Sequence, residues 1–139
     1  MKRIFLDTNI VIDALLEREE WMDEAFLILS LADRGDIEVY CSSLSLATAS
    51  YFMERAKMPH EIMMDKLDVF CQLCIPTRVD GSVVRQAIHS SFADFEDALQ
   101  YFSALTINAD AIITRNGKDF AHSVIPVMTA AEFLASYNK

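Results

Sequence analysis

The first candidate for chemistry is a carboxylate at the end of a short apolar run. Residues 4–6 are apolar, and Asp7, Thr8 and Asn9 follow them directly. Such a run predicts a buried parallel strand whose carboxyl end delivers Asp7, followed by a helix at 9–16. Because ligands of open α/β sheets bind outside the carboxyl ends of the strands, Asp7 is a candidate metal ligand or catalytic group. The alternative is that Asp7 or Thr8 only caps the helix, since both are good caps.

A second group of acids begins a helix predicted at 94–107. Asp94, Glu96 and Asp97 fall within one turn, where acids also complement the positive end of the helix dipole and Asp94 is a good cap. The stripe expected to be buried consists of Phe95, Ala98, Leu99, Phe102 and Leu105. Helical spacing places Asp97 on a flank of this stripe, and Glu96 and Gln100 further away. We therefore expect Asp97 to be half-buried, and Asp94 and Glu96 to be solvated.

A third group follows a strand predicted at 109–114, which ends at Thr114 and continues into Arg115, Asn116 and Asp119. If this strand neighbours the first one, its loop faces the same crevice as Asp7. Carboxylates that converge without Cys or His form an oxygen-only site, which suits Mg²⁺ or Mn²⁺ rather than zinc. Since Mg²⁺ bridges to substrate phosphates, the pattern indicates phosphoryl chemistry.

The elements that must position these groups alternate between strands and helices. Strands are predicted at 4–6, 37–41, 74–79, 109–114 and 126–128, and helices at 9–16, 22–34, 42–57, 60–73, 80–91, 94–107 and 130–137. This alternation predicts a three-layer α/β/α fold with a mainly parallel central sheet. With 139 residues, three Gly, three Pro and no internal repeat, the chain is expected to form a single domain over 1–139.

Composition narrows the function. A net charge of −9 argues against a protein that coats nucleic acid without acting on it. It does not argue against an enzyme that acts on nucleic acid, because a bound divalent cation inverts the local charge. We expect a cytoplasmic protein without membrane contact, since there is no signal peptide and no apolar run of about 20 residues. The cysteines, Cys41, Cys71 and Cys74, are expected to be reduced. Without further ligands to complete a zinc site, buried structural thiols are favoured.

Four segments together resemble a known family. They are residues 5–10, 94–100, 111–116 and 118–120, and in this order they resemble the PIN domain, the metal-dependent ribonuclease fold of VapC-like toxins in bacterial toxin–antitoxin pairs. The resemblance implies that Asp7 and Asp97 coordinate Mg²⁺ or Mn²⁺. A further acid usually follows the Thr-Arg pair. This chain has Asn116 there, so Asp119 is the nearest replacement.

The resemblance also implies a mechanism and a departure from it. Asp7 and Asp97 would hold the metal, Asp119 would complete or support the site, and waters would be oriented by Asn9, Thr114 and Asn116. The family commonly places a Glu in the helix after the second strand, but the matching run, 43–48, ends at Thr48. Thr48 cannot supply a carboxylate, so metal affinity is expected to be low.

Three functions remain open at this point. The first is a metal-dependent endoribonuclease of the toxin class, with RNA as substrate and an antitoxin as possible partner. The second is a PIN fold retained as an interaction module, which the missing Glu supports. The third is an aspartyl-phosphate phosphohydrolase. Such sites resemble Asp-x-Asp followed by Gly-Thr, whereas this chain has Asn9 in the third position and no Gly behind it.

Apolar side chains on more than one face of two helices predict self-association. They are Phe26, Leu27, Leu29, Leu31, Tyr51, Phe52 and Met53. A homodimer is the expected state, because two-fold pairing is the commonest way to cover such surfaces and PIN-like toxins usually pair. An antitoxin would be expected to use an amphipathic helix and a cationic side chain near the acids.

Overall fold

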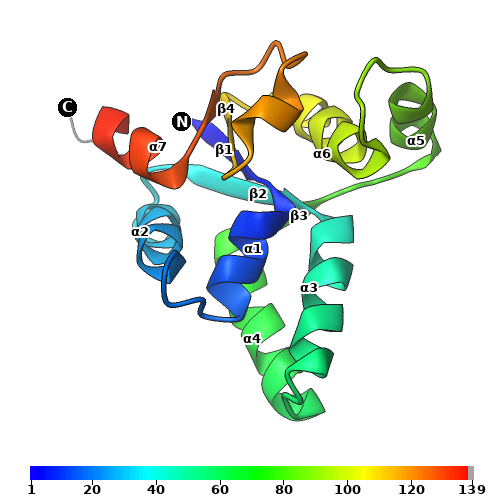
Figure 1. Ribbon diagram of the computed structural model, residues 1–139. Helices are drawn as coiled ribbons and strands as arrows, with labels where there is room; N and C mark the ends of the chain where they lie inside the picture. The colour runs from blue at the N-terminus through cyan, green and yellow to red at the C-terminus, as the bar shows by residue number, and fades with distance from the viewer. Residues whose placement is uncertain (138–139) are drawn as a thin grey trace.

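A parallel sheet forms the centre of the molecule, and a computed structural model describes residues 1–137 of it (Figure 1). Its strands are β1 (Arg3–Leu6), β2 (Glu38–Ser42), β3 (Cys74–Thr77), β4 (Ala111–Ile113) and β5 (Val127–Met128). They lie in the order β3-β2-β1-β4-β5, and every pairing is parallel. The expected class, a three-layer α/β/α fold with a mainly parallel sheet, is confirmed. The last two residues of the expected 1–139 domain lie outside the described residues.

Both faces of β1 are buried, which explains its continuous apolar sequence. Ile4 and Leu6 face one helical layer, and Phe5 faces the other. In register with Phe5, Tyr40 of β2 and Ile112 of β4 lie on the same face. Side chains alternate between the two faces of a strand, so a central strand covered on both sides must be apolar at every position.

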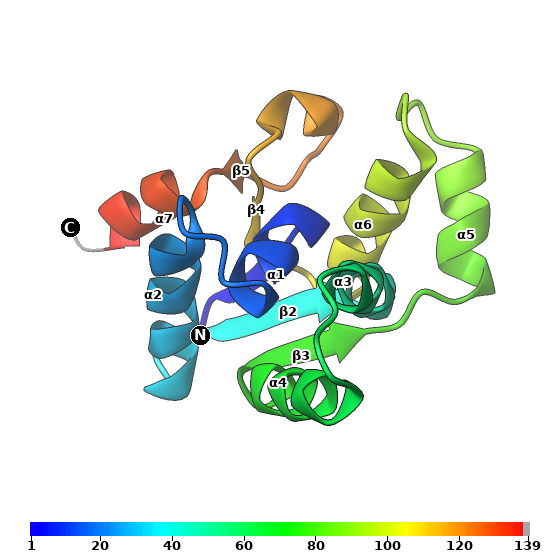
Figure 2. The ribbon, with the colours of Figure 1, turned by 60° about the horizontal axis from the view of Figure 1, so that its bottom comes forward.

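The helices divide between the two faces of the sheet (Figure 2). One layer contains α1 (Thr8–Leu15), α2 (Met22–Asp33), α3 (Ser43–Arg55), α4 (His60–Leu73) and α7 (Ala130–Tyr137). On the other face lie α6 (Phe95–Thr106) and the 3₁₀ helix η1 (Gly117–Phe120), with α5 (Gly81–Ile88) packed against α6. No helix within residues 1–137 is long and apolar enough to cross a membrane.

The strand order creates a crevice beside the end of β1. From β1 the chain proceeds to β2 on one side, while β4 pairs with the other side. The two strands end together, since the backbone N–H of Asp7 donates to the carbonyl of Ile113 at 2.9 Å. Crevices at such switch points are where ligands bind in open α/β sheets.

Several expected details differ in the structure. Strand β4 is shorter than predicted, although Asp110 and Thr114 on either side of it still donate to the carbonyls of Arg3 and Met128, and β3 ends at Thr77. Phe95 was expected in the buried stripe of α6, but 51% of it is exposed, and Gln100 was expected to point away but is fully buried. Both assignments were wrong, because α6 packs against the sheet on one side and against α5 on another. Phe95 lies in the first turn of α6, at the edge of the contacts with the sheet and with α5.

The cysteines follow the expected pattern in part. Cys41 and Cys74 are buried, whereas Cys71 is half-buried, and all three are free thiols. Burial raises the pKa of the Cys74 thiol well above its ordinary value. Buried thiols with raised pKa values are inert structural groups.

Candidate active site

Asp7 lies at the junction of β1 and α1, at the carboxyl end of the strand, and the capping role considered for it is present. Its side chain accepts a hydrogen bond from the backbone N–H of Thr8 at 2.8 Å, so it caps α1. Only 5% of Asp7 is exposed, which is unusual for a residue that is only a cap. Burial raises the pKa of the Asp7 carboxyl, hydrogen bonds lower it, and the charges of Glu96 and Asp119 raise it further.

Thr114 and Asn9 hold the second oxygen of Asp7. The Thr114 hydroxyl donates to Oδ2 of Asp7 at 2.8 Å, and Nδ2 of Asn9 lies 3.4 Å from the same oxygen. The hydroxyl of Thr114 also accepts from Asn9 at 3.3 Å and from the backbone N–H of Asn116 at 3.0 Å. Protein groups therefore occupy all three positions of this hydroxyl, and Thr114 orients the carboxylate itself.

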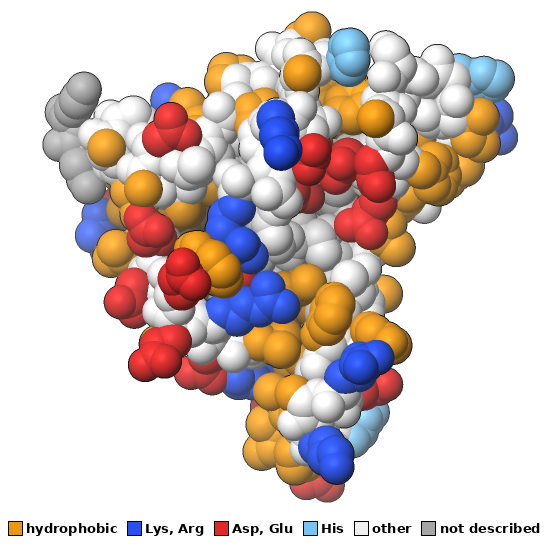
Figure 3. Space-filling model, in the orientation of Figure 1, with side chains coloured by type: hydrophobic (Ala, Val, Ile, Leu, Met, Phe, Trp, Pro, Cys, Tyr) orange, Lys and Arg blue, Asp and Glu red, His pale blue; other side chains and the backbone are white. Residues whose placement is uncertain are grey.

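Asp97 faces Asp7 from the first turn of α6. It is half-buried, whereas Asp94 and Glu96 are exposed, as expected from the helical spacing. Burial and the nearby carboxylates of Asp94, Asp7, Asp119 and Glu96, in that order, raise the pKa of Asp97 to about 7. Four other acids thus lie near enough to Asp97 to act on its charge. We call Asp7, Asp94, Glu96, Asp97 and Asp119 the acidic cluster, and Figure 3 shows Asp and Glu side chains gathered on this face.

Local capping and loop geometry explain how the other acids reach the crevice. Asp94 is the N-cap of α6 and accepts from the backbone N–H of Asp97 at 3.0 Å, which fixes the first turn of the helix. Asp119 is exposed on η1, directly after the turn that Thr114 and Asn116 form. Each acid is therefore placed by backbone structure at a strand or helix end.

A buried polar network lies beneath this crevice, and the sequence analysis missed it. Nε2 of Gln100 donates to the hydroxyl of Ser42 at 3.0 Å, and Oε1 accepts from Ser45 at 3.3 Å. The Ser45 hydroxyl also lies 2.8 Å from that of Thr8. The network connects α1, α3 and α6. The available signal was the position of Gln100, three residues after Asp97 and thus on the same helix face.

An ion-pair cluster behind the crevice was missed as well. Asp13 is fully buried and accepts two hydrogen bonds from the Arg115 guanidinium, at 3.0 and 3.1 Å, while Arg18 lies 3.5 Å away. The guanidinium of Arg115 stacks on the ring of Trp21 at 3.7 Å. Because Arg115 follows Thr114, this cluster fixes the loop after β4 against α1. A separation of 102 residues between Asp13 and Arg115 leaves no local sequence signal.

Thr48 lies on α3, one turn beyond Ser45. It is half-buried, and its hydroxyl donates to the carbonyl of Leu44 at 3.2 Å. Its hydroxyl is therefore hydrogen-bonded within its own helix, and the residue offers no carboxylate to the crevice.

The donor set of the acidic cluster suits a hard cation with few protein ligands. Within residues 1–137, no group of three or more His, Cys, Asp or Glu side chains is arranged so that it could hold a metal ion. Mg²⁺ retains several waters and is usually held by one or two carboxylates, which Asp7 and Asp97 can supply. Burial is the largest cause of the raised pKa values of both acids, and the charges of neighbouring carboxylates add to it.

Comparisons with known proteins agree with this architecture. Residues 3–118 match the family model described as PIN domain, so the chain belongs to the PIN domain family. A comparison with curated proteins gave no match. Among solved structures, a similar chain occurs in the crystal structure of VapBC2 from Rickettsia felis bound to a DNA fragment from the promoter. It is 21% identical, with a TM-score of 0.67 over 91% of this chain and 96% of that one.

Proposed function

We propose that this chain is a Mg²⁺- or Mn²⁺-dependent endoribonuclease and the toxin of a toxin–antitoxin pair. The observation that carries the proposal is the convergence of Asp7 and Asp97 at the switch point of the sheet, with pKa values raised by burial and by neighbouring acids. Carboxylate oxygens favour a hard divalent cation such as Mg²⁺, and such a cation favours phosphate chemistry. Membership of the PIN domain family supports a nuclease.

The residues of the site have separate roles in this proposal. Asp7 and Asp97 hold the cation, and Thr114 keeps Asp7 oriented. Asp119 and Asn116, exposed beyond β4, hold waters beside the phosphate. Asn9 links Asp7 to the backbone N–H of Arg115 through its amide group. When bound, the cation supplies positive charge to the phosphate and acidity to the attacking water.

The test measures cleavage of RNA with and without divalent cations. Purified protein is incubated with a labelled RNA in Mg²⁺, in Mn²⁺ and in chelator, alongside Asp7→Asn, Asp97→Asn and Asp68→Asn. Asp68 is exposed on α4, so its variant makes the same charge change outside the acidic cluster. We expect cleavage only with metal, its loss in the first two variants and its retention in Asp68→Asn. Equal cleavage by all four proteins would identify a contaminating nuclease.

The second candidate is a PIN fold retained as an interaction module. Thr48 supports it, since this residue supplies no carboxylate to the crevice. An interaction module predicts no metal-dependent cleavage at any concentration of Mn²⁺ and no effect of Asp97→Asn on partner binding. The cleavage assay therefore separates the two candidates.

An antitoxin partner is part of the proposal, supported by the structural likeness to VapBC2. A groove of about 490 Å³ between α1, α2 and α4 has an apolar lining that suits an amphipathic helix. Its apolar lining includes Leu15, Phe26, Leu29, Val69, Phe70 and Leu73. Asp33 and Asp65 at its rim favour cationic residues on that helix.

We also propose a homodimer. Of the side chains expected to drive self-association, Leu29, Leu31 and Met53 are buried and were wrongly included. Tyr51 and Phe52 of α3 remain exposed, as do Ile62 and Met64 of α4. Pairing of two copies would remove this apolar surface from water. Light scattering at micromolar concentration tests the proposal, because a mass of 15.7 kDa would mean a monomer.

A further inference from the structure

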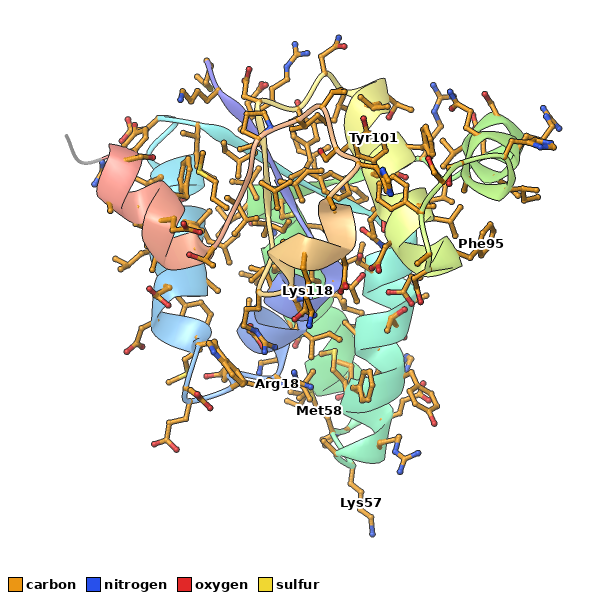
Figure 4. All side chains as sticks on the ribbon, turned by 45° about the horizontal axis from the view of Figure 1, so that its top comes forward. Arg18, Lys57, Met58, Phe95, Tyr101 and Lys118 are labelled. Atoms are coloured by element: carbon orange, nitrogen blue, oxygen red, sulfur yellow. The ribbon has the colours of Figure 1, made fainter. Side chains whose placement is uncertain are left out.

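A row of cationic side chains borders the acidic cluster. It consists of Arg18, Arg115 and Lys118, which we call the cationic strip. Arg115 and Arg18 are neighbours because both contact Asp13, and Lys118 directly precedes Asp119. Figure 3 shows Lys and Arg side chains beside the acids on this face, and Figure 4 shows Arg18 and Lys118 on the same side of the molecule. The strip thus begins at the acidic cluster and leads to the connection between α1 and α2.

The cationic strip carries more positive charge than its protein partners neutralise. Arg18 and Arg115 share the single carboxylate of Asp13. Lys118 is exposed and forms no ion pair or side-chain hydrogen bond with any residue in 1–137. Exposed acids, Glu19, Glu20 and Asp119, adjoin the strip in the sequence but form no ion pair with Arg18 or Lys118, so these cations stay available to an anion that extends beyond the crevice.

An aromatic ring lies within the strip. Trp21 is half-exposed, and the Arg115 guanidinium stacks on one face of its ring. Cations that track a backbone, combined with an aromatic side chain on which a base can stack, bind single-stranded nucleic acid. A duplex buries its base faces and could not use Trp21 in this way.

We propose that the cationic strip and Trp21 bind the phosphates and one base of a single-stranded RNA segment that flanks the phosphate in the acidic cluster. This inference rests on the proposed nuclease function and specifies its substrate. The strip offsets the repulsion between the acidic chain and RNA, and it aligns the strand so that one phosphate enters the crevice. Arg115 donates two hydrogen bonds to Asp13, whereas Arg18 makes one longer ion pair with it and Lys118 makes none, so the contacts with RNA are assigned to Arg18 and Lys118.

Trp21 provides a direct measurement, because it is the only tryptophan in the chain. Its fluorescence is titrated in chelator with a single-stranded oligoribonucleotide of about twelve nucleotides, at several salt concentrations. The variants are Arg18→Ala and Lys118→Ala, which leave the Asp13–Arg115 pair intact. Lys2→Ala is the matched control, since Lys2 is exposed before β1, at the opposite end of the strand from Asp7.

We expect RNA to quench Trp21, and each strip variant to weaken binding several-fold and lower the salt slope by about 0.7 for each lost phosphate contact. Lys2→Ala should match the wild type. Unchanged binding in both strip variants would overturn the proposal, as would equal affinity for the same sequence as a duplex. Polyglutamate that binds as tightly as RNA would instead identify a protein-docking surface. Cleavage is assayed in parallel, so loss of the strip effect and loss of nuclease activity remain distinguishable.

Discussion

Protonation of Asp97 should control metal binding near neutral pH. Burial and neighbouring acids raise the pKa of Asp97 to about 7. With that pKa, about one tenth of the side chain is ionised at about pH 6, and about nine tenths at about pH 8. A cation held by Asp7 and Asp97 needs the ionised form, so the apparent affinity should rise about tenfold between these pH values. The raised pKa of Asp7 can only steepen this dependence.

Calorimetry with Mn²⁺ at several pH values measures this directly. Repeating each titration in buffers of different ionisation enthalpy counts the protons released, which should approach one from Asp97 below pH 7 and fall towards zero above it. Asp97→Asn should bind Mn²⁺ weakly and lose this proton release, whereas Asp68→Asn should retain both. An affinity that is constant across this pH range in the wild type would refute the assignment of Asp97 as a ligand.

Four further predictions follow from the structure. Metal-free protein should lose thermal stability as the pH rises from about 4 to about 7 and level off above it, because the folded state holds the Asp97 proton more tightly than the unfolded chain, and Asp97→Asn should remove this loss. Thr48→Glu should strengthen Mn²⁺ binding in calorimetry by adding an oxygen ligand, and unchanged affinity would mean that Thr48 does not face the site. Gln100→Leu should lower the free energy of unfolding, measured in urea, by about 1–3 kcal/mol, because it leaves the buried hydroxyls of Ser42 and Ser45 without their amide partner. Arg115→Met should lower the free energy of unfolding by about 3–5 kcal/mol, because it leaves buried Asp13 with only the longer contact to Arg18, and adding Asp13→Leu should restore part of the loss if the pair is the cause.

The sequence by itself determined the class of fold and the principal acid of the candidate site. An apolar run that ends in a carboxylate gave a central strand with Asp7 at its carboxyl end, because a strand covered on both faces must be apolar until it leaves the sheet. Helical spacing likewise distinguished half-buried Asp97 from exposed Asp94 and Glu96. These are local properties, which follow from the periods of the strand and helix.

Only the tertiary structure decided what surrounds those acids. Gln100 and Phe95 exchanged their expected environments, because α6 packs against both the sheet and α5 and a helix has no single inward direction in that arrangement. The pairing of Asp13 with Arg115 joins segments 102 residues apart. Such contacts depend on which strands become neighbours, and so do the raised pKa values of Asp7 and Asp97, since burial and the approach of other charges exist only in the folded chain.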